Sequence, residues 1–95
     1  MDPDLESFLG VALSSDGAVD MENTRKGLTW RGAEAHAALR DHFRELLETR
    51  SLTLRGWGLI NDLDFDDEDA LYTYLQAAYD YLFEGADAPP PAPWL

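Results

Sequence analysis

Residues 19–31 read Val-Asp-Met-Glu-Asn-Thr-Arg-Lys-Gly-Leu-Thr-Trp-Arg, and the fold class depends on the structure this stretch adopts. Apolar and polar residues alternate in 19–22 and again in 28–31, on either side of a polar loop that contains Gly27. Two alternating runs joined by such a loop are typical of a β-hairpin. The stretch therefore predicts two antiparallel strands within residues 18–31.

Helices are predicted on both sides of this hairpin. Asp2 and Pro3 form a good helix start, because an Asp side chain can cap the first turn and Pro has no N–H to leave unpaired there. Apolar residues then repeat at helical spacing over 3–15, and Gly17 suits a left-handed cap. After the hairpin, residues 33–49 carry one apolar stripe, made by Ala35, Leu39, Phe43, Leu46 and Leu47.

The stretch from residue 52 to 65 predicts one or two further strands. Its apolar positions alternate with polar ones and change phase at Gly56, as a bulge or a bend would require. Asn61-Asp62 could equally be a turn that divides the stretch in two. A last helix is predicted over 67–84, where four acids stand at the end that the helix dipole makes favourable for negative charge.

The predicted fold is a small single-domain α+β protein in which about three helices pack on a short antiparallel sheet. The domain spans residues 1–85, and residues 86–95 form a Pro-rich extended tail that ends in Trp94-Leu95, a candidate docking peptide. The alternative fold is an all-α bundle in which the short alternating runs are loops.

Charge is unevenly distributed along the 95 residues, which have a net charge of −12. Residues 25–55 contain all seven bases with four acids, whereas residues 56–95 contain nine acids and no base. A net charge of magnitude roughly 2–8 is enough to keep a small domain soluble, and the magnitude here exceeds that range. Because such a field repels nucleic acid and anionic membranes and attracts basic protein surfaces, we expect neither direct nucleic-acid binding nor membrane binding. The seven bases are expected mainly to neutralise neighbouring acids.

An acid-rich run over residues 62–69 is the candidate binding site. If residues 62–66 are extended, Leu63 and Phe65 point to the core, and Asp62, Asp64 and Asp66 point outward together. The predicted partner-binding acids are Asp62, Asp64, Asp66, Asp67, Glu68 and Asp69. An EF-hand loop that began at Asp62 would need Gly at its sixth position and Glu at its twelfth, but Asp67 and Thr73 stand there. We therefore predict a charged ridge and no metal site.

The last helix has a wider apolar arc than a surface helix requires, roughly 200° against about 100°. Tyr72 and Tyr79 flank the centre of this arc. A helix packed on two sides explains the width, and an exposed tyrosine patch is the alternative, since Tyr is enriched at interfaces. We include Tyr72 and Tyr79 in the predicted partner-binding surface.

Catalysis has little support in the sequence. The chain has no Cys, no Ser in a nucleophile-elbow motif and no Gly-rich phosphate loop. His36 and His42 are six residues apart on one predicted helix, on different faces, and cannot chelate one metal ion as a pair four apart can. We predict no enzyme activity, no catalytic residue and no cofactor.

These features predict an acidic inhibitor that occupies a basic groove of a nucleic-acid-handling enzyme such as a nuclease. Immunity proteins and phage inhibitors of bacterial defence, including anti-CRISPR-type inhibitors, act in this way, and a line of carboxylates can mimic the phosphate line of DNA. The alternative is a self-associating structural or adaptor module without inhibitory activity, and the oligomeric state stays open. An acidic N-terminus and the lack of a long apolar run predict a cytoplasmic location in a bacterial host cell.

Overall fold

All regular structure in the described part of the chain is helical. The computed structural model describes residues 2–14 and 20–90, and within these ranges there is no strand. The helices are α1 (Pro3–Ala12), α3 (Met21–Leu28), α4 (Ala33–Thr49), α5 (Leu54–Ile60) and α6 (Glu68–Phe83). The prediction of an α+β domain built on an antiparallel sheet is therefore wrong, and the all-α alternative fits.

Helix α3 and the turn after it replace the predicted hairpin. The Asp20 carboxylate caps this helix by accepting a hydrogen bond from the Asn23 N–H at 3.4 Å. Met21 and Leu28 are seven residues apart and both buried, as two turns of helix require. Runs of four residues are too short to separate this spacing from alternation. Val19, where the first strand was predicted to begin, lies outside the described residues.

Helix α5 and a loop replace the strands that were predicted between residues 52 and 65. The Thr53 hydroxyl caps the helix by accepting from the Gly56 N–H at 3.0 Å. Three apolar residues spaced three apart then turn toward the core, namely Leu54, Trp57 and Ile60. Leu59, one of the alternating apolar positions of the predicted strands, is 82% exposed and does not face the core. The error arose because a helical face was taken for the alternation of a strand.

The three long helices lie where the sequence predicts them. α4 has the predicted bounds, while α1 and α6 correspond to the predictions over 3–15 and 67–84. As predicted, Asp2 caps α1, its carboxylate accepting from the Leu5 N–H at 3.0 Å. The predicted cap Gly17 lies outside the part of the chain that the structure describes.

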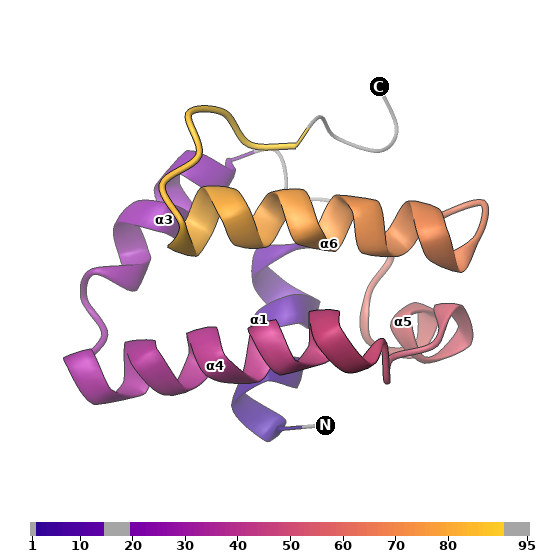
Figure 1. Cartoon of the computed structure of the whole chain (residues 1–95), viewed down its shortest axis with the longest axis horizontal. Coiled ribbons are helices and arrows are strands. Elements are labelled where there is room, and N and C mark those ends of the chain that lie inside the picture. Colours follow the sequence, from indigo (N-terminus) through magenta and orange to yellow (C-terminus); the bar gives the residue numbers. More distant parts are fainter. Residues whose placement is uncertain (1, 15–19, 91–95) are drawn as a thin grey trace.

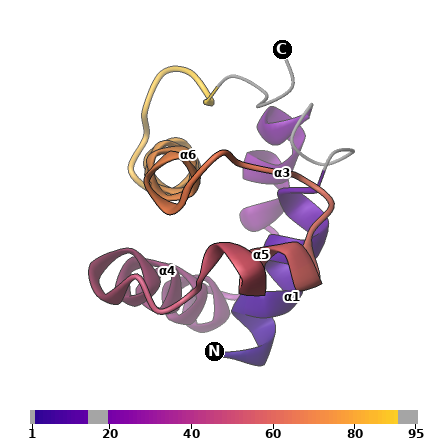
Figure 2. The same cartoon turned by 90° about the vertical axis from the view of Figure 1, so that its right-hand side faces the viewer.

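The helices pack in two groups around one core. α4 and α6 run antiparallel beside each other, and α1 crosses behind them (Figure 1). In the view turned by 90°, α4 and α6 lie on one side and α1 and α3 on the other (Figure 2). Helix α6 contacts both α4 and α3, whereas α1 contacts α4 and α5. Among the described residues, no helix combines the length and apolar composition needed to cross a bilayer.

Helix α6 is the centre of the core. Half of its residues are buried: Leu71, Tyr72, Tyr74, Leu75, Ala78, Tyr79, Tyr81 and Leu82. They belong to one core cluster with buried side chains from every other helix, including Leu9 of α1, Phe43 of α4 and Trp57 of α5. This two-sided packing accounts for the wide apolar arc seen in the sequence.

The chain folds back over α6 after that helix ends (Figure 1). Gly85 takes a left-handed conformation with φ 79°, and the Ala86 N–H donates to the Asp80 carbonyl at 3.0 Å. Arg25 of α3 donates to the Ala86 carbonyl at 3.4 Å. These bonds bring the start of the predicted tail back along α6 as far as Pro90, which is buried. The candidate docking residues Trp94 and Leu95 are not among those described.

Candidate functional site: an acidic loop at the start of α6

The loop between α5 and α6 carries the predicted acids, and three hydrogen bonds hold its first half. The Trp57 indole N–H donates to the Leu63 carbonyl at 2.9 Å. The Asn61 side chain donates to the Leu9 carbonyl of α1 at 2.8 Å and accepts from the Leu63 N–H at 2.9 Å. The loop is therefore fixed to α5 through the Leu63 carbonyl and to α1 through the Asn61 side chain.

Aromatic packing holds the second half of the loop. The Phe65 ring lies with its centroid 6.0 Å from that of Trp57 and 5.3 Å from that of Tyr74. Leu63 is buried, and Phe65 is partly buried against the core. The acids that alternate with these two residues are exposed: Asp62, Asp64 and Asp66. The predicted alternation is confirmed, although a loop and not a strand produces it.

The next three acids begin helix α6. The Asp67 carboxylate is the helix cap and accepts from the Ala70 N–H at 2.7 Å. Glu68 and Asp69 are exposed in the first turn, where the positive end of the helix dipole stabilises negative charge. All six predicted acids are thus exposed, and we call the stretch that carries them the acidic ridge (residues 62–69).

A base of the protein itself reaches the acidic ridge. Arg50, at the end of α4, lies 2.9 Å from the Asp69 carboxylate and stacks over the Tyr72 ring at 4.6 Å. The hydrogen bond that Arg50 donates to the Asp69 carboxylate raises the pKa of Arg50 above its ordinary value. Asp69 is therefore partly neutralised and Asp67 is occupied as a cap, so the six acids are not equivalent as partner-binding groups.

The two tyrosines predicted for the binding surface are inside the fold. Tyr72 is 7% exposed and Tyr79 is 4% exposed. The Tyr72 hydroxyl accepts from the Leu52 N–H at 3.1 Å and donates to the Leu52 carbonyl at 2.7 Å. The Tyr79 hydroxyl donates to the Glu84 carboxylate at 2.8 Å. Burial raises the pKa of both phenols, and the expectation of an exposed tyrosine patch is corrected.

A groove next to the acidic ridge was not predicted. It has a volume of about 450 Å³ and lies between the loop, α6 and the returning chain. Asp64 and Asp66 line it together with Phe65, Tyr74 and Pro90. Residues 64–66 and Pro90 are far apart in sequence, and the turn at Gly85 brings them together. No periodicity in the sequence could have signalled this meeting.

Histidines and acids do not gather into a metal centre in the described ranges, where no group of three His, Cys, Asp or Glu residues is placed to hold an ion. His36 packs its ring 5.4 Å from that of Phe83, and His42 lies 3.6 Å from the Asp2 carboxylate.

Comparison of the chain with protein-family models, with curated proteins and with solved structures found no match.

Proposed function

We propose that this protein is a stoichiometric inhibitor that binds a basic groove of a nucleic-acid-handling enzyme through the acidic ridge. The observation that carries the proposal is the outward projection of Asp62, Asp64 and Asp66 from a loop whose apolar residues are anchored in the core. Glu68 extends the same exposed surface into α6. A line of carboxylates on a fixed backbone complements a cationic groove built to hold phosphates.

The fixed loop supports binding in a second way. Association ordinarily costs free energy for ordering loops and side chains at the interface. Hydrogen bonds from Trp57 and Asn61 already order the backbone of this loop in the free protein. Less ordering therefore remains to oppose binding, and the carboxylates approach a partner with their spacing already set.

Self-association through the aromatic arc of α6 has less support. Tyr72, Tyr74, Tyr79 and Tyr81 are all buried within the chain, so the arc is not available to a second copy. The three large apolar side chains that are exposed among the described residues, Val11, Trp30 and Leu59, lie on α1, after α3 and on α5. The acidic ridge is therefore the better-supported interaction surface.

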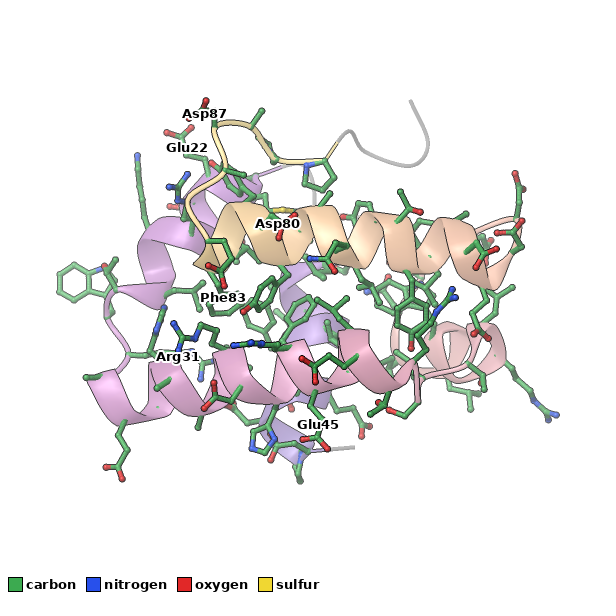
Figure 3. All side chains as sticks on the ribbon, viewed as in Figure 1. Glu22, Arg31, Glu45, Asp80, Phe83 and Asp87 are labelled. Carbon is green, nitrogen blue, oxygen red and sulfur yellow. The ribbon has the colours of Figure 1, made fainter. Side chains whose placement is uncertain are left out.

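The test compares two variants that lose the same charge at different places. In the ridge variant, Asp62, Asp64 and Asp66 become Asn and Glu68 becomes Gln. In the matched variant, Glu6, Glu34 and Glu45 become Gln and Asp87 becomes Asn. All four of these acids are exposed, and Figure 3 shows Glu45 beside α4 and Asp87 in the segment after α6, both away from the loop. Wild type and both variants serve as baits in extract of the native host.

The proposal expects one partner to be retained by wild type and the matched variant and lost by the ridge variant. One equivalent of wild-type protein should then stop the purified partner from acting on nucleic acid. The association rate should fall steeply with added salt, since charge complementarity accelerates encounter. A partner that the ridge variant holds equally well, or whose action on nucleic acid is unaffected, would contradict the proposal.

A further inference from the structure

The groove beside the acidic ridge combines an apolar floor with an acidic rim. Ala70 and Ala77 of α6 contribute only methyl groups to it, and Phe65 and Pro90 contribute ring carbons. Asp64 and Asp66, both exposed, stand at one side. This arrangement fits a ligand with an apolar stem and a cationic end, because the stem can displace water from the floor while the charge stays at the rim.

Tyr74 provides an independent indication that the groove is incomplete without a ligand. Its side chain helps to line the groove and is 6% exposed. The hydroxyl is buried and has no hydrogen-bond partner among the residues that the structure describes. Most buried hydroxyls in native proteins have a partner, and one left unpaired requires an explanation such as strain, a functional role or a bound water or ion. The hydroxyl lies below the accessible surface, so a ligand in the groove can pair with it only by displacing the atoms that cover it.

We infer that this groove receives an arginine side chain of the partner protein, with its aliphatic stem over Ala70, Ala77 and Pro90 and its guanidinium at Asp64 and Asp66. The inference rests on the proposed function and locates one specific contact within that interface. In the bound state, the guanidinium would stack on Phe65 and donate to the carboxylates, and Tyr74 would lie beneath it.

Arginine fits this groove better than lysine for reasons of shape. A guanidinium is planar, carries five donors in a fixed fork and can serve two carboxylates and a hydroxyl together. It also stacks on aromatic faces and is more weakly hydrated than an ammonium, so it loses less on entering a partly apolar groove. The net negative charge of the chain and the absence of any base after residue 55 favour a cation as the occupant.

The test titrates the full chain with three short blocked peptides of the same sequence except for one central residue, which is Arg, Lys or Gln. Amide chemical shifts measured by NMR give the affinity and the location. The arginine peptide is expected to cause saturable shifts at residues 64–66, 70 and 74–77, with weaker binding of the lysine peptide and none of the glutamine peptide. Shifts confined to other parts of the chain, or equal affinity for arginine and lysine, would overturn the inference.

Two variants test the groove by shape and by hydrogen bonding. Ala77→Leu fills the floor and should abolish the saturable shifts. Tyr74→Phe keeps the shape and should lower the affinity roughly two- to tenfold, as loss of one hydrogen bond predicts. Glu34→Gln, in the first turn of α4 and outside both the ridge and the groove, is the control and should leave the affinity unchanged. If both groove variants bind the arginine peptide as wild type does, the inference fails.

The two experiments fail separately. The inference falls if the arginine peptide ignores the groove, even when the ridge variant loses its partner and the proposed function stands. Conversely, the proposed function falls if the ridge variant retains the partner and its inhibition, whatever the peptide does.

Discussion

At the scale of single residues, two tyrosines of α6 differ in whether the buried hydroxyl has a hydrogen-bond partner. Tyr72 both donates to and accepts from the Leu52 backbone, whereas the Tyr74 hydroxyl is buried without a partner in the described ranges. Tyr72→Phe should lower the free energy of unfolding by about 1–3 kcal/mol, because the Leu52 N–H and carbonyl lose their partner. Tyr74→Phe should raise it by about 1 kcal/mol, because a buried unpaired hydroxyl is removed. Urea unfolding of both variants measures the two changes, and a shared sign would contradict this account.

The burial of Tyr74 also predicts how stability depends on alkaline pH. Burial raises its pKa to about 12 from the ordinary value of 10. The unfolded chain therefore loses this proton near pH 10, while the folded protein keeps it until near pH 12. Over that window the free energy of unfolding should fall by up to about 1.4 kcal/mol per pH unit from this residue alone.

This effect can be isolated by comparing the urea midpoints of wild type and Tyr74→Phe at pH about 9 and about 11. The other tyrosines with a raised pKa are present in both proteins and cancel in the comparison. The variant should lose less stability between the two pH values. Equal losses would show that the Tyr74 hydroxyl titrates alike in the folded and unfolded states.

Packing between whole elements depends on a close approach where α1 meets α5. A Cβ added at Gly10 would lie 2.8 Å from the Ile60 backbone carbonyl, which cannot move without shifting α5. Gly10→Ala should therefore lower the free energy of unfolding by about 1–3 kcal/mol. Gly58→Ala, on α5 itself, is the matched control, because its Cβ would meet no described atom within 4 Å.

Gly58→Ala should raise the free energy of unfolding by about 0.5–1 kcal/mol, since Gly in a helix interior costs entropy. Thermal unfolding followed by circular dichroism measures both glycine variants. A destabilising Gly58→Ala with a neutral Gly10→Ala would contradict the packing of α1 on α5.

Long elements could be predicted from the sequence and short ones could not. The apolar stripe over 33–49 covers several turns, so only a helix fits it, and α4 has those bounds. Met21 and Leu28 fit a strand pair and a helix alike, and here the Asp20 cap and core contacts with α6 decide for α3. α5 contains two glycines in seven residues, and tertiary packing of Trp57 outweighs this poor helix propensity.

The candidate site was predictable to the extent that it depends on neighbours in sequence. Leu63 and Phe65 turn inward and the acids that alternate with them are exposed, which alternation alone predicts. The Arg50–Asp69 pair and the groove beside Pro90 arise from the packing of α4 and of the returning chain on α6. These depend on the three-dimensional arrangement of helices that a sequence pattern does not contain.

Over the whole molecule, bases are largely paired internally, as their position in the sequence predicted. Carboxylates lie within ion-pair distance of Lys26, Arg31, Arg40, Arg44 and Arg50. Such exposed pairs contribute little to stability, but they neutralise the middle of the chain. The excess of negative charge is left to the two flanking segments, and the acidic ridge is its densest run in the described structure.

The indole N–H of Trp57 can report the opening of the loop between α5 and α6. Its N–H proton is held by the Leu63 carbonyl in the core, so it can exchange with deuterium only when that segment opens. Trp30 is 89% exposed, and its indole proton should exchange at the solvent rate in the same sample. Exchange at Trp57 should be slow, and slower still when a ligand bound in the groove holds the loop closed. Equal exchange rates at the two indoles would mean that the loop opens freely.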